Sequence, residues 1–302
     1  MNPLPDGRGS WQVNFFPCLF EQPQGDPMRL IPRIPNWLRP WRNPAGAGVR
    51  HRSRFQNIYH CTVQKSASQW VRRILSDRRI LSFGALSHLA LPDEVGRRKP
   101  IEQTFAEPFP ERTILSPLYV SYERFAEIPK APPYRAFFVM RDPRDVAVSW
   151  YFSAKFSHAT HPEIERIRVQ LQSWSESDGL LFAIDFLQAF GLFAAQLSWI
   201  DAPARDPNVL LTRYEDLTGP RQVPCFQQLL NHCDIRLPAA ELVELLHENS
   251  FEQLSGRRRG EEDVNAHYRK GVAGDWRAHF DDRVHARFLE AAGQTLSLWG
   301  YS

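Results

Sequence analysis

The pattern of apolar and polar positions predicts strands that alternate with helices from about residue 57 onward. The run NIYHCTV, residues 57–63, is typical of a strand, and SASQWVRRILSD after it places Trp70 and Ile74 on one face of a helix. The run RAFFVM, Arg135–Met140, is continuously apolar, as expected of a central parallel strand buried on both faces.

A second helix is predicted directly after this central strand, in the segment DPRDVAVSWYF. Asp142 suits the N-cap, Pro143 the first helical position and Asp145 the third. The run NVLLTRYEDL, residues 208–217, predicts a third strand with a polar exit. Further helices are predicted over residues 180–200, 238–248 and 281–298. This alternation predicts an α/β fold with a doubly wound parallel sheet flanked by helices.

Three segments lie outside this alternation. Residues 84–134 are interrupted by prolines and are expected to be irregular, with loops on the substrate side. Residues 255–274 form a loop rich in Arg and Gly. Residues 1–54 are rich in Pro, Arg and Gly, and we expect an arm whose aromatic cluster docks on the body. Residues 55–302 are then one domain.

Composition narrows the class of protein. The 302 residues are 43% hydrophobic and 24% charged, which suits one large globular core. A net charge of +3 is too small to indicate a nucleic-acid binder. The stretch 180–200 carries Asp185 and predicts a buried or amphipathic helix, not a membrane span. No secretory signal is expected from the first residues.

The number and spacing of the cysteines indicate in which cellular compartment the protein works. The chain has four of them, scattered without CxxC spacing. This distribution argues against a disulfide framework and against a zinc site. We therefore expect a reducing compartment, the cytoplasm.

The corner QKSASQW, between the first strand and its helix, has features of an anion-binding loop. In a doubly wound sheet, ligands bind at the carboxyl ends of strands, where helix N-termini present free N–H groups. Lys65 supplies a charge there, and Ser66, Ala67 and Ser68 allow close backbone approach and add hydroxyl donors. Trp70 lies one turn further and can stack on a base. The alternative is a solvated lysine and a core tryptophan.

A second corner follows the central strand. Arg141 leaves that strand and Ser149 lies about two helical turns into the next element, so the two can share one anion. The alternative is an ion pair between Arg141 and Asp145, with Ser149 as an ordinary packed residue.

The segment YRKGVAGDWRAHF, Tyr268–Phe280, is the third candidate. Arg269 and Lys270 stand beside Gly271, which permits tight backbone approach. The alternative is a basic surface loop. The conjunction of the three segments on one α/β framework favours a shared anion site.

These segments resemble the cytosolic-type sulfotransferases, which use 3′-phosphoadenosine 5′-phosphosulfate (PAPS). QKSASQW resembles their PKSGTTW loop, and FFVMRDPRDVAVSWYF resembles their 3′-phosphate segment, a strand followed by R-N-x-K-D-V-x-V-S-Y-Y. VLLTRYEDL resembles their YEDM strand, and YRKGVAGDWRAHF their RKGxxGDWKxxF loop. The similarity spans roughly residues 55–300 and implies the P-loop-NTPase-like sulfotransferase fold.

The resemblance also implies a ligand and its contacts. PAPS would be the co-substrate, 3′-phosphoadenosine 5′-phosphate (PAP) its product, and no metal would be needed. The residues around the 5′-phosphosulfate and adenine would be Lys65, Ser66, Ala67, Ser68, Gln69 and Trp70, with Tyr214 near the adenine. Those at the 3′-phosphate would be Arg141, Ser149, Arg269, Lys270 and Gly271.

The sequence departs from the family in the first loop. Ala67 stands where the family has glycine, which is harmless only if its φ is negative. Gln69 replaces a threonine and removes one hydroxyl contact. The dimer motif of the family is not recognisable near residues 277–290, so the oligomeric state stays open.

The larger departure concerns catalysis. Sulfuryl transfer resembles phosphoryl transfer, and Lys65 is the expected stabiliser of the leaving oxygen. The family histidine of the K-T-H-L-P segment is missing, because Leu115 falls at that place. His158 is the first candidate for the general base, and His161 and Glu111 are alternatives. An acidic acceptor would need no base.

We therefore predict sulfuryl transfer from PAPS to a hydroxyl or amine of a small-molecule acceptor, without nucleic acid or membrane partners. A catalytically silent adenosine-bisphosphate-binding protein is the main alternative, because the histidine is missing. Two other classes are not favoured. A P-loop kinase would need the motif GxxxxGK[ST], which is not evident, and a membrane-anchored carbohydrate sulfotransferase would need an N-terminal span, which we do not expect here. The acceptor itself can be a phenol, alcohol, amine, lipid or sugar.

Overall fold

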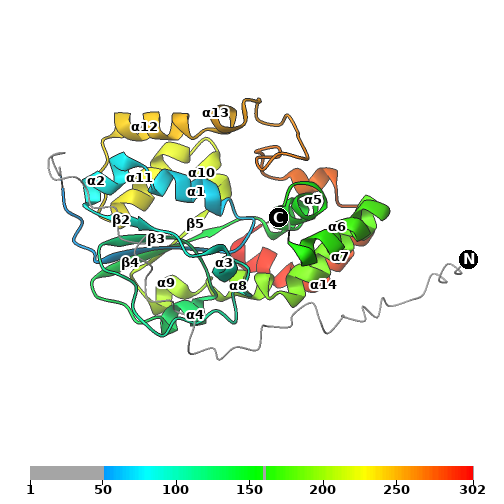
Figure 1. Cartoon of the computed structure of the whole chain (residues 1–302), viewed down its shortest axis with the longest axis horizontal. Coiled ribbons are helices and arrows are strands. Elements are labelled where there is room, and N and C mark those ends of the chain that lie inside the picture. The colour runs from blue at the N-terminus through cyan, green and yellow to red at the C-terminus, as the bar shows by residue number, and fades with distance from the viewer. Residues whose placement is uncertain (1–50, 159–160, 302) are drawn as a thin grey trace, which may run out of the picture.

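A parallel sheet forms the centre of the molecule and carries helices on both faces (Figure 1). The computed structural model describes residues 51–158 and 161–301, and within them the sheet has five strands in the order β2-β3-β1-β4-β5. The strands are β1 Asn57–Thr62, β2 Ser87–Leu89, β3 Thr113–Tyr119, β4 Tyr134–Met140 and β5 Val209–Arg213. All of their pairings are parallel. The predicted doubly wound α/β fold is therefore confirmed.

Alternating side chains of β1 and β4 divide the core into two halves. Ile58 and Phe137 pack on one side of the sheet, and Tyr59 and Phe138 on the other, all fully buried. The first side is covered by α1 Ser68–Leu75, α2 Arg78–Gly84, α11 Gln222–His232 and α12 Ala239–Glu248. The second is covered by α4 Tyr122–Glu127, α7 Glu176–Ala189, α8 Leu192–Ser198 and α14 Asp282–Trp299. Burial on both faces explains the continuous apolar run of β4.

The helix after β4 begins as its sequence predicts. Asp142 is the N-cap of α5 Pro143–Phe152, where its side chain accepts from the backbone N–H of Arg144 at 2.9 Å. A π-helix, Ser153–Ser157, continues α5. The remaining elements are α3 Asp93–Gly96, α6 Pro162–Ser173, α9 Ala202–Arg205, α10 Tyr214–Thr218, α13 Phe251–Ser255 and a 3₁₀-helix Asp275–Ala278.

The expectation of an irregular segment over residues 84–134 is wrong. The segment contains β2, α3, β3 and α4, and β3 pairs with β1 in the middle of the sheet. Pro117 lies within β3 and interrupts its pattern, since proline lacks the N–H of a sheet ladder. The pairing with β1 shifts register there, from Tyr59 opposite Leu115 to Cys61 opposite Leu118, and this irregularity accommodates the proline.

Two element boundaries also differ from prediction. The predicted helix 180–200 is two helices, α7 and α8, separated at Gly191, whose φ of 76° lies in the left-handed region. The predicted third strand ends at Arg213, and YEDL forms α10 with Glu215 and Asp216 in its first turn. The helices predicted over 238–248 and 281–298 are confirmed as α12 and α14.

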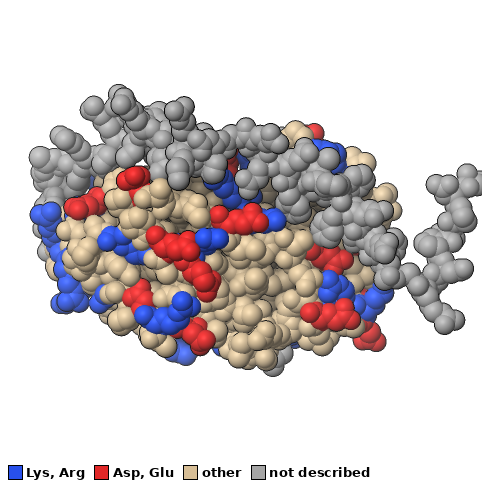
Figure 2. All heavy atoms as spheres, turned by 90° about the horizontal axis from the view of Figure 1, so that it is seen from below, with Lys and Arg blue, Asp and Glu red and all other residues tan. Residues whose placement is uncertain are grey.

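Hydropathy and surface charge complete the description. Among the described helices, none is by itself long and apolar enough to cross a membrane, although α7 and α8, bent by 56°, pass that test as a pair. On the face shown in Figure 2, basic and acidic side chains are interspersed over the part that is not grey. The expected arm, residues 1–54 with Cys18, falls almost entirely outside the described residues.

Candidate active site

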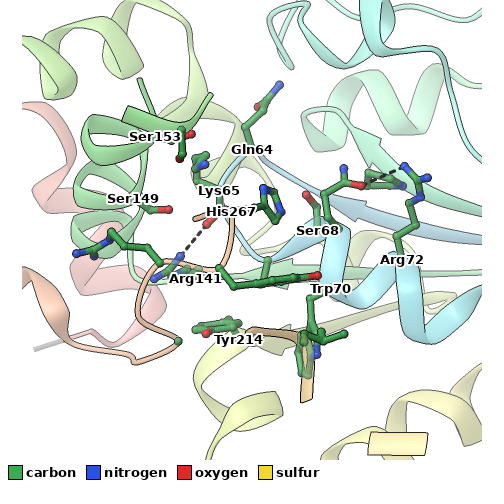
Figure 3. Close-up of a pocket in the computed structure, with 18 of the residues that line it drawn as sticks. Gln64, Lys65, Ser68, Trp70, Arg72, Arg141, Ser149, Ser153, Tyr214 and His267 are labelled. Atoms are coloured by element: carbon green, nitrogen blue, oxygen red, sulfur yellow. Dashed lines mark hydrogen bonds between the residues drawn. The ribbon is translucent and has the colours of Figure 1, made fainter. Parts of the chain in front are cut away.

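The carboxyl ends of four strands open into one cavity of about 510 Å³ (Figure 3). Lys65 follows β1, Tyr119 ends β3, Arg141 follows β4 and Tyr214 follows β5, and all four line the cavity. This is the edge at which doubly wound sheets bind their ligands.

The cavity brings together the residues that four separate sequence segments predicted for nucleotide binding. Those that line it are Lys65, Ala67, Ser68, Gln69, Trp70, Arg141, Ser149, Tyr214, Arg269, Lys270 and Gly271. Ser66, the remaining one, is fully buried in the same loop. The two corners and the C-terminal loop thus form one site.

The loop between β1 and α1 is held in an unusual backbone conformation. Lys65 has a φ of 66° and Ala67 a φ of 59°, both in the left-handed region. This turn lets the Ala67 carbonyl accept from the backbone N–H groups of Trp70 at 3.0 Å and Val71 at 3.1 Å, which starts α1. Left-handed backbone costs a non-glycine residue roughly 1–2 kcal/mol. The condition for alanine to replace glycine without strain is therefore not met.

Lys65 is in a cationic, desolvated environment. Burial, followed by the nearby charges of Arg141 and Arg269, lowers the pKa of Lys65 to about 8. The Arg141 guanidinium donates to the Lys65 carbonyl at 3.0 Å, and lies 4.8 Å from the centre of the Tyr214 ring. Three cations are thus concentrated in one cavity, which favours a polyanionic ligand.

Arg141 forms the ion pair with Asp145 that the alternative expected, but it is long, with the nearest N and O atoms 4.0 Å apart. The Asp145 carboxylate has closer partners, because it accepts from the backbone N–H groups of Gly274 at 2.7 Å and Trp276 at 3.0 Å. Asp145 therefore joins α5 to the C-terminal loop, and Arg141 is directed to the cavity.

In the C-terminal loop, Arg269 and Lys270 both form ion pairs with the carboxylate of Asp275. Lys270 Nζ lies 2.6 Å from Asp275 Oδ1, and Arg269 also pairs with Asp275. Burial alone would raise the pKa of Asp275, but hydrogen bonds from His279, Lys270 and Arg269 lower it well below its usual range. At Gly271, with φ at 70°, an added Cβ would lie 2.3 Å from the Phe251 ring, so only glycine fits.

Four buried polar atoms at or beside the cavity have no hydrogen-bond partner within the described chain. Two are acceptors, Oε1 of Gln64 and of Gln103, and two belong to donor groups, the Ser66 hydroxyl and Nε of Arg141. A buried donor without a partner costs about 1–3 kcal/mol, and an oxyanion supplies the missing acceptor. The donor set therefore fits the phosphates of a nucleotide. Over the described residues, His, Cys, Asp and Glu form no group of three or more that could hold a metal ion.

The predicted general bases differ in position. Leu115, at the place of the family histidine, is buried in the core. His158 lines the cavity at the end of the π-helix. Glu111 and His161 are not among the residues that line the cavity. Nδ1 of His161 lies 3.9 Å from Oε2 of Glu163.

Sequence reasoning missed several residues of the cavity wall. The Tyr119 hydroxyl lies 2.7 Å from the Ser68 hydroxyl, and Phe251 and Arg259 also line the site. Their segments carry no pattern that points to a ligand. His267 is different, because it directly precedes the motif YRKG and lies near Lys65 in Figure 3. Its position directly before a predicted binding motif could have identified His267 as a residue of the site.

The comparisons with known proteins agree with this geometry. A family model described as a sulfotransferase domain matches residues 56–300. A search of curated proteins found no match. Among solved structures, mouse sulfotransferase SULT7A1 complexed with PAP matches with 18% identity over 84% of this chain and 91% of that chain, at a TM-score of 0.56.

Two structures of retinol dehydratase match more weakly. One holds androsterone and the inactive cofactor PAP and has 15% identity over 80% of each chain, at a TM-score of 0.45. The other holds retinol and PAP and has 16% identity over 80% of this chain and 81% of that one, at a TM-score of 0.47.

Proposed function

Because the chain belongs to the sulfotransferase domain family, we propose that it transfers a sulfuryl group from PAPS to a hydroxyl or amine of a small-molecule acceptor. One observation carries the proposal. The cavity concentrates Lys65, Arg141 and Arg269 around buried donors that lack partners within the described chain. A nucleotide with phosphates at both its 3′ and 5′ positions would neutralise these charges and satisfy these donors.

The two ends of the nucleotide would occupy different walls. Arg141, Ser149 and the Arg269–Gly271 segment would hold the 3′-phosphate, and the Lys65–Ser68 loop the 5′-phosphosulfate. Trp70 and Tyr214, with ring centres 6.4 Å apart, would contact the adenine. The Trp70 indole N–H already donates to the Asn249 carbonyl at 2.7 Å, which fixes the ring for that contact.

Lys65 would act in the chemical step. As the acceptor oxygen bonds to sulfur, the bond from sulfur to the 5′-phosphate oxygen breaks, and negative charge grows on that oxygen. A lysine placed beside it stabilises the transition state more than the ground state. We expect Lys65→Ala to lower kcat by about 10²–10³-fold at saturating PAPS. A kcat near that of the wild type would leave Lys65 a binding residue only.

A catalytically silent PAP-binding protein is the second candidate. The replacement of the family histidine by Leu115 favours it, since a buried leucine cannot accept a proton. His158 is the one of the three bases predicted from sequence that lines the cavity. Turnover with any acceptor separates the two candidates.

We place this activity in the cytoplasm. Cys61, Cys225 and Cys233 are free thiols in the described chain, and Cys61 and Cys233 are buried. Such thiols persist in a reducing compartment.

Incubation with PAPS labelled in its sulfuryl group tests the proposal. The protein is mixed with a crude metabolite extract and, separately, with a panel of phenols, alcohols and amines. We expect the label to appear in one small-molecule product and PAP to accumulate in equal amount. PAP binding without any labelled product would favour the silent protein.

A further inference from the structure

His267 occupies a position in the cavity that the nucleotide-binding role does not explain. It lies two residues before Arg269 in the C-terminal loop and lines the cavity together with Lys65 and Ser68. In Figure 3 its ring stands between the labelled Lys65 and Ser68 side chains. This is the part of the site where the sulfuryl group would be transferred.

The loop backbone around His267 is fixed by neighbours in the same loop. The Arg257 guanidinium donates to the carbonyls of Tyr268 and Arg269, the latter at 2.9 Å. The backbone N–H of Asp263 also donates to the Arg269 carbonyl, at 3.0 Å. The imidazole therefore belongs to the same loop segment as the two cations proposed for the 3′-phosphate.

The surroundings of His267 keep its imidazole neutral. His267 is solvent-exposed. Desolvation by the cavity wall, followed by the charges of Lys65 from the β1–α1 loop and His158 from the end of the π-helix, lowers the pKa of His267. A neutral imidazole near pH 7 has a free nitrogen that can accept a proton. Of the three bases expected from sequence, neither Glu111 nor His161 lines the cavity, and His158 does so from the end of the π-helix, so His158 is the competing candidate.

We propose that His267, carried by the nucleotide-binding loop beside Lys65, is the general base of the sulfuryl transfer. The inference rests on the proposed function. As the acceptor oxygen bonds to sulfur, its proton passes to the imidazole nitrogen, and the bond from sulfur to the 5′-phosphate oxygen breaks. The leaving electron pair remains on PAP beside Lys65. The imidazolium then releases its proton to solvent.

This placement has a consequence for the order of events. The base and the cations for the 3′-phosphate belong to one loop, so the nucleotide would position the base as it binds. An acceptor bound without nucleotide would meet an unassembled site.

The test uses PAPS labelled in its sulfuryl group, with water as the acceptor, so that no identified acceptor is required. Release of labelled sulfate is measured for the wild type, His267→Ala, His158→Ala and His247→Ala. His247 is exposed on α12 and does not line the cavity, so it is the matched control. PAP affinity is measured by calorimetry for each protein.

We expect His267→Ala to lose about 10²-fold in rate, with saturating PAPS and with PAP affinity largely kept. Added imidazole should restore part of the loss in His267→Ala, and His247→Ala should match the wild type. In the wild type the rate should rise with pH through the pKa of His267, and His267→Ala should lack that rise.

Two outcomes would overturn the inference. One is a rate for His267→Ala within twofold of the wild type while His158→Ala is strongly impaired. The other is a loss in His267→Ala that imidazole does not restore and that follows a fall in PAP affinity. Wild-type sulfate release equal to that of buffer alone, together with no labelled product from the extract or the acceptor panel, would instead contradict the proposed function itself.

Discussion

Lys65 and Ala67 lie in one turn at the cavity, and both have left-handed φ values. Glycine adopts this conformation without steric cost, whereas side chains with a Cβ do not. The strain is kept because the turn starts α1 and directs the loop toward the cavity. Strained backbone is found repeatedly at ligand-binding sites.

We expect Ala67→Gly to stabilise the protein by about 1 kcal/mol in the free energy of unfolding. The relief of left-handed strain exceeds the added entropy of glycine in the unfolded chain. Denaturant unfolding measures the change. Ala291→Gly, within helix α14, is the control and should destabilise by about 1 kcal/mol. A destabilised Ala67→Gly would show that the alanine side chain is needed there.

The pKa of Lys65 predicts how nucleotide affinity depends on pH. Binding of an anion favours charged Lys65, whose pKa in the free protein is about 8. Below pH 8 the lysine is already charged, so its contribution is constant. Above pH 8 binding must take up a proton, and affinity for PAP should fall by up to about tenfold per pH unit.

Calorimetry in two buffers of different ionisation enthalpy would detect this proton uptake near pH 9. Lys65→Arg keeps its charge across this range, so its PAP affinity should not fall. A wild-type affinity that is constant from pH 7.5 to 9.5 would contradict the environment described for Lys65.

At the scale of single residues, contiguous motifs were sufficient to predict which side chains meet at the cavity, while their roles stay predictions. Lys65, Arg141 and Lys270 each stand at the end of a strand or beside a glycine, where the local pattern already indicates an exposed anion site. Tyr119 and Arg259 reach the cavity from segments with no such pattern. Their role depends on tertiary placement, which local sequence does not encode.

At the scale of elements, strand β3 shows why the pattern of apolar residues was not enough to predict every strand of the sheet. Its side chains from Thr113 to Leu118 are buried, yet Pro117 within it suggested an irregular segment. The irregular pairing with β1 removes the conflict, and that pairing is visible only in the sheet. The start of α5, by contrast, depends on three adjacent residues and was predicted correctly from them.

The C-terminal loop is the element expected to respond to nucleotide. Asp145 holds its end, while its basic segment is stabilised by a few backbone hydrogen bonds, such as Gly260 N–H to the Lys270 carbonyl at 2.9 Å. Arg269 and Lys270 already share the Asp275 carboxylate, and a bound phosphate would link them to Arg141 across the cavity. We expect PAP at 100 times its Kd to slow amide exchange in residues 256–274 by up to about 100-fold.

Hydrogen exchange resolved by mass spectrometry checks this expectation. Helix α12, Ala239–Glu248, packs against α11 away from the cavity and is the internal control. Exchange in the loop that is unchanged by PAP, or slowed no more than in α12, would contradict a nucleotide-ordered loop.

At the scale of the whole molecule, the sheet determines the site. Because β1, β3, β4 and β5 are parallel, the residues after them meet at one edge although they are far apart in sequence. The alternation of strands and helices was sufficient to predict this arrangement. The division at residue 54 and the role of the arm before it stay predictions, since residues 1–50 are outside the described part of the chain.

The central claim is that this cavity is built for a nucleotide with a 3′-phosphate, and the affinities for PAP and 5′-AMP test it most directly. Charge-assisted hydrogen bonds contribute about 1.5–3 kcal/mol each, and a tenfold change in affinity corresponds to about 1.4 kcal/mol. With Arg141, Arg269 and Lys270 in the site, calorimetry should show PAP binding at least about 10²-fold more tightly than 5′-AMP. Equal affinities for the two nucleotides would contradict the account.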